Sequence, residues 1–357
     1  MYNCAEDVLA HHDEEVTLLQ ADRDTMRERR NANRDRLKKG LAAKGKPAPR
    51  EFKSQGSYAM KTMVQHPEKD YDIDDGVYFD KEVLVGDRGA EMTALQARQM
   101  VRDAVDDGSF KTPPEVRKNC VRIYYTAGYH VDMPVYRRVT TKDIFDNETY
   151  HYELASSSWK RSDARDVTAW FENENTAQSP DTKNGRQLRR ITRQIKKFAR
   201  SRGSWSGQII SGFGITKLVT ERFRANSDRE DQALYDTMKA IRDRLNYDLV
   251  VAHPVTPNET ITNGDEDPKS RFLRDKLTEA INNLAPLFES DCTREKALKC
   301  WDKVFNTDFF IGREKADAGL EAKSALAAPA VLAADMVASA AAAAESAVRK
   351  EGGGRYA

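Results

Sequence analysis

The spacing of apolar residues along the chain changes character near residue 165. Residues 13–41 are highly charged, contain no Pro and have no Gly before Gly40, and they carry apolar residues at nearly helical spacing, which predicts one long amphipathic helix. These apolar positions are Leu18, Leu19, Met26 and Leu37. Later segments are rich in β-branched and aromatic residues and predict strands. The predicted strands cover residues 77–79, 83–85, 121–125 and 129–136, and a helical pattern occupies residues 92–105. A long helix, a small sheet and a covering helix predict an α+β domain over residues 1–165.

Beyond that domain the apolar spacing is almost wholly helical, which predicts an all-helical domain over residues 166–311. Its apolar faces contain Leu188, Ile191, Ile195 and Phe198; Ile215, Leu218 and Val219; Leu234, Met238, Ile241 and Leu245; and Phe272, Leu273, Leu277, Ile281 and Leu284. Residues 312–357 are Ala-rich and end in Gly-Gly-Gly-Arg-Tyr-Ala, so we expect a flexible C-terminal tail.

The charge balance excludes a chain that is attracted as a whole to polyanions. The 357 residues include 58 Lys plus Arg and 57 Asp plus Glu, for a net charge of +1. Any anion site must therefore be local, and neither nucleic acid nor a membrane is an expected partner. The chain starts without the pattern of a secretory signal, and Pro329, Asp335 and Glu345 interrupt the Ala-rich run, so we expect a cytoplasmic protein.

The sequence lacks the motifs of several common metal and nucleotide sites. Cys4, Cys120, Cys292 and Cys300 are scattered, with no CxxC pair, so we expect four free thiols and no zinc knuckle. There is no P-loop motif and no HExxH motif.

Three acidic residues form the most informative constellation. Asp72 and Asp74 are two positions apart, so on a strand both carboxylates project from one face. Asp132 interrupts an otherwise apolar strand, where an ionised carboxylate is costly unless it is paired or bound to metal. If the two strands are neighbours, the three carboxylates repel one another unless cations bind between them, which indicates a two-metal phosphoryl-transfer site. Taken singly, the acids at 72, 74 and 75 also fit a solvated strand end, and Asp132 fits a salt-bridged core residue.

Two further segments offer groups for phosphate. A Gly-Ser turn at Gly56 and Ser57 can present backbone N–H groups and a hydroxyl to an anion, although alone it also fits an ordinary turn. Residues 185–200 contain no acid in a nearly neutral chain. Arg189, Arg193, Lys196 and Lys197 are the cations best placed there to neutralise a polyphosphate. For Arg186, Arg190 and Arg200, a solvated helix face is an equally good interpretation.

Residues 52–62, 70–78 and 130–136 resemble the polymerase-β-like nucleotidyltransferases, with their Gly-Ser turn, paired acids and third acidic strand residue. Within that superfamily they look like the bacterial cGAS-like branch, the CD-NTases, and especially its cyclic dinucleotide synthases of CBASS anti-phage defence. With the blocks at 189–198 and 211–216, the similarity spans roughly residues 13–310. The resemblance implies a polymerase-β-like nucleotidyltransferase core with a long N-terminal helix, followed by an all-helical domain that completes a nucleotide cleft.

The resemblance also implies a role for individual residues. Two Mg²⁺ ions, or Mn²⁺, would bind Asp72, Asp74 and Asp132, and Asp132 would help to deprotonate the attacking ribose hydroxyl. The triphosphate would be held by Gln55, Gly56 and Ser57, and by Ser211 together with Lys196 or Lys197. The nucleotide pocket would be bordered by Tyr58, Met60 and Asp70, and Asn258 is the candidate for reading the base.

The favoured function is a Mg²⁺-dependent enzyme that joins two nucleoside triphosphates, ATP and/or GTP, into a cyclic dinucleotide such as cGAMP in anti-phage signalling. One alternative is a linear oligonucleotide synthase of the oligoadenylate or tail-adding kind, and another is a non-catalytic nucleotide-binding module. Some relatives have their terminal residue conjugated to targets, so a partner that acts on the tail through Ala357 is a further hypothesis, equally compatible with a plain tail.

Overall fold

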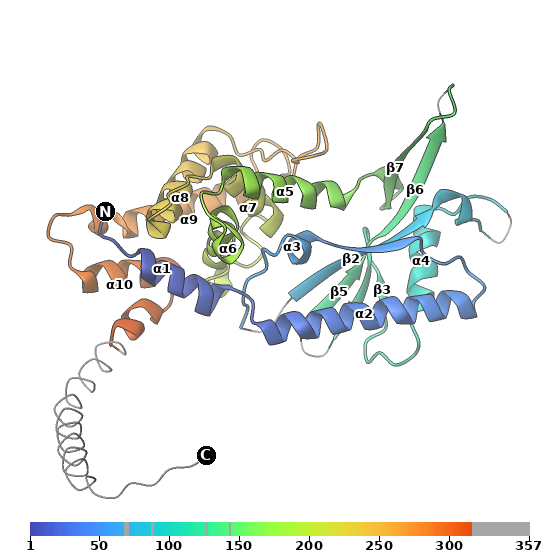
Figure 1. Ribbon diagram of the computed structural model, residues 1–357, viewed down its shortest axis with the longest axis horizontal. Helices are drawn as coiled ribbons and strands as arrows, with labels where there is room; N and C mark the ends of the chain where they lie inside the picture. Colours follow the sequence, from blue (N-terminus) through green and yellow to red (C-terminus); the bar gives the residue numbers. More distant parts are fainter. Residues whose placement is uncertain (68–70, 87–88, 126–127, 143, 316–357) are drawn as a thin grey trace, which may run out of the picture.

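The computed structural model describes residues 1–67, 71–86, 89–125, 128–142 and 144–315 (Figure 1). A mixed sheet with two covering helices forms one half of the molecule, and a bundle of helices forms the other (Figure 1). Each half has its own hydrophobic cluster. The predicted α+β class and the helical second half are therefore confirmed. The tail from residue 316 to Ala357 lies outside the described residues.

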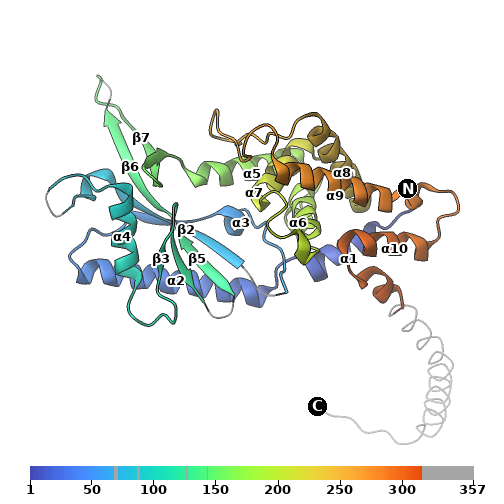
Figure 2. The same cartoon turned by 180° about the vertical axis from the view of Figure 1, so that it is seen from behind.

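The sheet has eight strands in the described part of the chain. They are β1 Glu51–Gln55, β2 Tyr71–Asp80, β3 Glu115–Val116, β4 Val121–Tyr124, β5 Tyr129–Met133, β6 Val135–Lys142, β7 Glu148–Ala155 and β8 Trp159–Arg161. The long strand β2 is central, because it pairs with β1 in antiparallel fashion and with both β5 and β6 in parallel fashion. Strands β6 and β7 continue beyond the sheet as a projecting hairpin (Figures 1 and 2).

The predicted strand at residues 129–136 is divided into β5 and β6 at Pro134. Proline has no N–H to give to a ladder, but its carbonyl can still accept a hydrogen bond. Here the Val77 amide donates to the Pro134 carbonyl at 2.8 Å, so β2 passes from one partner strand to the next without losing its register. The interruption therefore leaves the acidic end of β5 fixed beside β2.

Helices α2 (Gln20–Ala43) and α4 (Ala94–Val105) cover the apolar face of the sheet (Figures 1 and 2). Alternation along β2 gives Ile73, Val77 and Phe79 to this face, and all three are fully buried. The residues between them, Asp72, Asp74 and Tyr78, belong to the opposite face. The covering helices thus fix which face of β2 is available to a ligand.

The helical half contains α5 Ala164–Gln178, α6 Gln187–Ala199, α7 Gly212–Arg222, α8 Glu230–Tyr247, α9 Pro268–Asn283 and α10 Arg294–Phe305. Helix α6 is central, since it contacts α7, α8 and α5 and nearly all of its residues are buried. Its apolar face, predicted from Leu188, Ile191, Ile195 and Phe198, is confirmed as part of the helical core. Among the described residues, no helix combines the length and the apolar character that crossing a bilayer requires.

The prediction of one continuous helix over residues 13–41 is wrong. The segment instead contains α1 (Ala5–His11), a π-helical turn (His12–Val16) and, after a break, α2. The break occurs because Thr17 is extended and pairs with Val64, while the Gln65 amide donates to the Val16 carbonyl at 3.0 Å. As a result Val8 packs in the hydrophobic cluster of the helical half.

The strand predicted at residues 83–85 is also wrong. Lys81–Val83 forms a 3₁₀ turn, and only Val85 makes an isolated bridge, with Glu91. Val83 and Val85 are 42% and 45% exposed, so their β-branched side chains find no sheet to pack on. The sequence analysis also missed β1, β7, β8 and α5, which are rich in charged and polar residues. The four free thiols are confirmed.

Candidate active site

The three acidic residues lie on neighbouring parallel strands. Asp74 of β2 is the register partner of Asp132 of β5, and Asp72 is the partner of His130. Partners in a parallel pair direct their side chains to the same face, and their backbones are about 4.8 Å apart. The convergence predicted for Asp72, Asp74 and Asp132 is therefore present at the level of strand register. Asp75, the next residue, faces the other way and forms an ion pair with Arg34 of α2 at 2.5 Å.

A basic side chain lies among these carboxylates. Arg122 of β4 donates from Nε and Nη2 to the two carboxylate oxygens of Asp132, at 2.8 and 2.7 Å, and its Nη2 is 3.6 Å from Asp72 Oδ1. His130 Nδ1 is 3.3 Å from the same Asp72 oxygen. Asp132 is thus the salt-bridged residue that the alternative interpretation described, and it is also a neighbour of the other two acids.

The electrostatics of Asp74 show how close these acids are. Burial, then the charges of Asp132 and Asp72, raise the pKa of Asp74 to about 7, and Arg122 opposes this shift. Because burial and two neighbouring carboxylates oppose the ionisation of Asp74, a divalent cation bound at this position would relieve the repulsion.

Gly56 is required where β1 turns into the short helix α3 (Gly56–Ala59). Its φ of +61° is unfavourable for other residues, and a Cβ placed on it would be 2.2 Å from Asp74 Oδ2. The Gly-Ser turn is therefore packed directly against the acidic cluster. Beside it, buried Gln55 donates from Nε2 to the Tyr78 hydroxyl at 2.7 Å and accepts from the Tyr136 hydroxyl at 3.2 Å. Both ends of the Gln55 amide are thereby engaged by protein groups.

Lys196 brings α6 to the same place. Its Nζ donates to Thr62 Oγ1 at 2.8 Å. Burial, then the charges of Arg200 and Arg193, lower the pKa of Lys196 to about 7. No acid among the described residues offsets these effects, so an anionic ligand would stabilise the charged form of Lys196.

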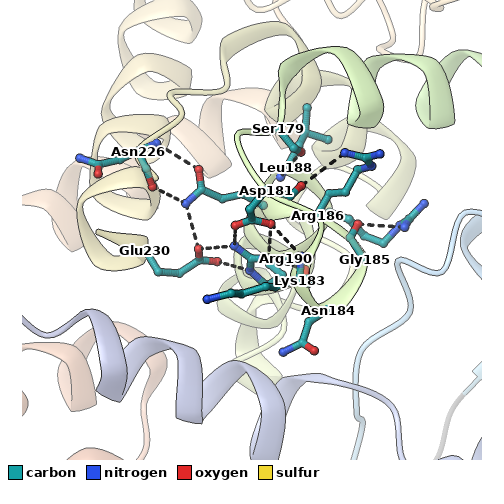
Figure 3. Close-up of polar contacts among 12 residues, drawn as sticks. Ser179, Asp181, Lys183, Asn184, Gly185, Arg186, Leu188, Arg190, Asn226 and Glu230 are labelled. Atoms are coloured by element: carbon teal, nitrogen blue, oxygen red, sulfur yellow. Dashed lines mark hydrogen bonds and ion pairs between the residues drawn. The ribbon is translucent and has the colours of Figure 1, made fainter. Parts of the chain in front are cut away.

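Other cations of the basic block have structural partners. Arg190 is not on a solvated face: it is buried and donates to the carboxylates of Asp181 and Glu230, which surround its guanidinium (Figure 3). Arg189 forms an ion pair with Glu172 and donates to the Met60 carbonyl, and Arg193 donates to the Lys61 carbonyl. Arg189 and Arg193 thus join α6 to the segment after α3, and neither of them lines the cavity described below.

A cavity of about 710 Å³ lies between the two halves of the molecule. The sheet half contributes polar residues and the segment after α3: Gln55, Gly56, Ser57, Met60, Thr62, Met63, Val64, Tyr71, Asp72, Asp74, Asn119 and Ser162. The helical half contributes a more apolar wall: Ala164, Val167, Lys196, Ala199, Arg200, Ile209, Ile210, Ser211, Gly212, Phe213, Ile215 and His253. One cavity therefore joins Asp72 and Asp74, a buried lysine and an apolar surface.

The cavity separates the predicted site residues into two groups. Those that line it are Gln55, Gly56, Ser57, Met60, Asp72, Asp74, Lys196 and Ser211. Four predicted residues do not line the cavity: Tyr58, Asp132, Lys197 and Asn258. The Tyr58 ring lies under Arg30, and Asp132 is engaged by Arg122. Lys197 is half-buried beside Lys196, and Asn258 is exposed in its loop. Asp70 lies outside the described residues.

Sequence reasoning missed much of the helical wall. Arg200 belongs to the basic block, but the helical spacing of this block did not distinguish Arg200 from a residue on a solvated face. Phe213 lies in the Ser-Gly-Phe-Gly turn, and His253 directly precedes the Pro-containing loop, so both had a local signal. Asn119 and Ser162 have none, because only the folding of distant segments brings them to the cavity.

A second hollow, of about 640 Å³, is bordered by α7 and α8. It is lined by four acids and four bases: Glu221, Asp236, Asp243, Asp248, Arg222, Arg224, Lys239 and Arg244. Charges of both signs in equal number select no class of ligand, so the larger cavity is the candidate active site.

The acidic residues fit a hard divalent cation by donor chemistry, since carboxylate oxygens are the preferred ligands of Mg²⁺. Their side chains are not yet arranged as a ligand set: within the described ranges, no three His, Cys, Asp or Glu side chains are grouped so as to hold an ion. The reason is visible in the contacts, because Asp132 is directed to Arg122 and Asp72 to His130. Metal binding would require Asp132 to exchange the guanidinium for the ion.

The part of the sheet that carries the three acids matches the nucleotidyltransferase domain of a known family. Residues 50–136 match the family model described as "Cyclic GMP-AMP synthase DncV-like, nucleotidyltransferase domain". This match extends from the residue before β1 into β6 and includes Asp72, Asp74 and Asp132. The predicted resemblance to the CD-NTases, which are cGAS-like nucleotidyltransferases, is confirmed.

Solved structures of CD-NTases share the fold. Vibrio cholerae DncV cyclic AMP-GMP synthase, in complex with the linear intermediate 5′ pppA(3′,5′)pG, superposes with a TM-score of 0.64 at 17% identity, covering 85% of this chain and 96% of that one. Escherichia coli MS115-1 CdnC with ATP gives 0.61 at 15% identity, covering 85% and 98%. Bradyrhizobium diazoefficiens CdnG with GTP gives 0.62 at 14% identity, covering 87% and 98%. At these identities the superpositions establish the fold, and it extends over both halves of the molecule.

Proposed function

We propose that this chain condenses two nucleoside triphosphates, ATP and/or GTP, into a cyclic dinucleotide such as cGAMP, in a Mg²⁺-dependent reaction. In each of two steps a ribose hydroxyl oxygen forms a bond to an α-phosphorus, the bond from that phosphorus to the bridging oxygen breaks, and pyrophosphate leaves. The second step closes the ring. The observation that carries the proposal is the single cavity that joins Asp72 and Asp74 to Lys196 and to an apolar wall.

The residues have distinct tasks in this reaction. Asp72, Asp74 and Asp132 would hold two Mg²⁺ ions, which orient phosphate oxygens and stabilise developing negative charge when bound. Asp132 would accept the proton of the attacking hydroxyl. Lys196 of α6 and the exposed Arg200, which directly follows this helix, line the cavity and would bind the triphosphate together with Ser57 and Ser211. Gln55 would be a positioning residue, since both ends of its amide form hydrogen bonds with tyrosines.

Relatives with this fold support the choice of substrate and product. The V. cholerae enzyme contains a linear intermediate built from adenine and guanine nucleotides, and the CdnC and CdnG structures contain ATP and GTP. A chain that shares their fold and has Asp72, Asp74 and Lys196 in one cavity is expected to use the same kind of substrate.

The test is product formation from four labelled nucleoside triphosphates with Mg²⁺, followed by phosphatase. We expect a phosphatase-resistant product from ATP, GTP or both, and its loss by at least about 10³-fold in Asp72→Asn plus Asp74→Asn. Asp146→Asn is a matched control, because this carboxylate is 80% exposed on the hairpin. Products that phosphatase degrades would show a linear synthase, and unchanged turnover in the double variant would contradict the metal assignment.

We further propose that the product signals in anti-phage defence in the cytoplasm. A cell that expresses the intact system is expected to reduce phage plating efficiency, and the Asp72→Asn plus Asp74→Asn variant is expected to abolish the effect. Conjugation through Ala357 stays a prediction, which mass spectrometry of the chain co-expressed with its partner can test.

A further inference from the structure

The apolar wall of the cavity contains a pair of rings that no part of the proposed reaction uses. Phe213 is at the start of α7, and His253 is in the loop that follows α8. Their ring centroids are 5.4 Å apart with an interplanar angle of 66°, so the rings meet edge to face. Both line the cavity that contains Asp72 and Asp74, together with Val167, Ile209 and Ile210. Rings and aliphatic side chains of this kind form a surface suited to a nucleobase.

The hydrogen bonds of the loop fix the protonation of the His253 ring. The backbone amides of Val255 and Thr256 point at Nδ1, at 3.3 and 3.0 Å. Two N–H donors leave no room for a hydrogen on that nitrogen, so Nδ1 is an acceptor and the ring hydrogen is on Nε2. Burial lowers the pKa of His253, which favours the neutral ring. The two charged groups that influence it most, Glu259 and Lys160, form an ion pair with each other at 2.9 Å.

The loop also holds the position of the ring. The His253 amide donates to the Glu259 carbonyl at 2.8 Å, and Ala252 makes a bridge with Thr260. Within the described residues, the hydrogen bonds of the His253 side chain all involve Nδ1. His253 is half-buried and lines the cavity, so the N–H of Nε2 is a fixed donor that a bound molecule can use.

We infer that His253 reads the base of a bound purine nucleotide, by donating from Nε2 to a ring nitrogen or carbonyl oxygen of the base while Phe213 forms part of the apolar surface around it. This inference rests on the proposed function, because it requires a nucleotide in this cavity. It names a specificity residue for that function, one that lies five positions before the Asn258 favoured by the sequence analysis.

The variant His253→Asn separates base reading from loop structure. An Asn side-chain oxygen can accept hydrogen bonds from the amides two and three residues later, as Nδ1 does here, so the loop is retained. Asn has no donor at the position of Nε2. His151→Asn is the matched control, since His151 is also half-buried but belongs to β7 and does not line the cavity.

The measurement is calorimetric binding of non-hydrolysable ATP and GTP analogues, with inorganic tripolyphosphate as a probe that lacks a base, all with Mg²⁺. We expect His253→Asn to weaken at least one purine analogue by about five-fold, the worth of one hydrogen bond, and to leave tripolyphosphate affinity unchanged. His151→Asn should change neither. If His253→Asn weakens the binding of nucleotide and tripolyphosphate equally, or weakens neither, the inference about His253 is wrong but the proposed function is not affected. Failure of the wild-type chain to bind any nucleotide would overturn the proposed function with it.

Discussion

Gly56 shows how a single backbone position can control an acidic site. The residue has a left-handed φ of +61°, and the space beside its Cα is filled by the Asp74 carboxylate. A side chain here meets two separate costs, one from backbone conformation and one from displacement of a carboxylate that belongs to the site.

Gly56→Ala is therefore expected to reduce product formation by at least about 100-fold, because it moves the group that positions phosphate and metal. Gly45→Ala is the matched control: Gly45 has a φ of +60°, but a Cβ there would contact nothing within 4 Å. It should cost about 1 kcal/mol of unfolding free energy and no activity. Steady-state kinetics and urea unfolding of both variants check the prediction. Equal kinetics for the two variants would show that contact with Asp74 is unimportant.

Arg122 is the second residue whose role can be isolated. It forms an ion pair with Asp132 and approaches Asp72, so its positive charge lies in the region where a cation would bind. A metal ion must compete with it for Asp132.

Arg122→Gln is expected to tighten Mn²⁺ binding to the nucleotide-free protein by roughly three- to ten-fold, measured by electron paramagnetic resonance of free Mn²⁺. Arg117→Gln, at an exposed arginine that pairs with Glu115, should leave Mn²⁺ affinity unchanged. Weaker Mn²⁺ binding in Arg122→Gln would instead show that the arginine holds the acids in their binding arrangement.

At the scale of elements, the docking of α1 depends on an uncharged histidine. His11 is buried among Phe305, Phe309 and Phe310, with ring centroids 4.4, 5.3 and 5.0 Å away. Burial, then the charges of Lys197 and His12, lower the pKa of His11 to about 3. The unfolded chain has an ordinary histidine pKa near 6.5. As the pH falls from about 6.5 toward 3, protons bind preferentially to the unfolded chain. The stability that comes from burying the uncharged His11 ring is therefore present at neutral pH and is lost in acid.

Between pH 7.5 and 5.0, the wild-type chain is expected to lose about 2 kcal/mol more unfolding free energy than His11→Leu, which removes the titrating group. Phe309→Leu serves as the control, because it alters the same ring cluster and leaves His11 in place. Its pH dependence should match that of the wild type. Urea unfolding at the two pH values gives the comparison, and equal losses in wild type and His11→Leu would contradict it.

The elements also show what the sequence could and could not predict. The acids on β2 and β5 were predictable, because the spacing of Asp72 and Asp74 and the interruption at Asp132 are local patterns. The arginines of α6 were misleading: their lack of neighbouring acids in the sequence concealed partners such as Glu230, 40 residues away. The break between α1 and α2 depends on Val64, and β2 passes from β5 to β6 at the Pro134 carbonyl, so neither feature could be found from periodicity alone.

At the scale of the whole molecule, the cavity receives walls from two hydrophobic clusters that share no buried residue in the described chain. A nucleotide that fills this cavity contacts both halves, so it binds the folded arrangement and not the unfolded chain. Binding of that kind raises the free energy of unfolding in proportion to the logarithm of ligand concentration.

A non-hydrolysable ATP or GTP analogue with Mg²⁺, at 100 times its dissociation constant, is expected to raise the free energy of unfolding by about 2.7 kcal/mol. This corresponds to an increase in melting temperature of roughly 3–5 °C for a chain of this size. The analogue should stabilise Lys196→Met less at the same concentration, because this variant lacks the buried cation. Scanning calorimetry of the two proteins tests the prediction, and an identical shift in both would exclude Lys196 from the binding site.

The docking of α1 against the last described helices also affects how the chain is made. Asp7 forms its ion pair with Arg294, a residue that is synthesised 287 positions later. At ribosomal rates of about 5–20 residues per second, the first helix emerges roughly 15–60 s before its partner. During that interval His11 lacks the phenylalanine rings that surround it in the folded protein and Asp7 lacks its basic partner, so a segment made late in synthesis completes the packing of the first helix.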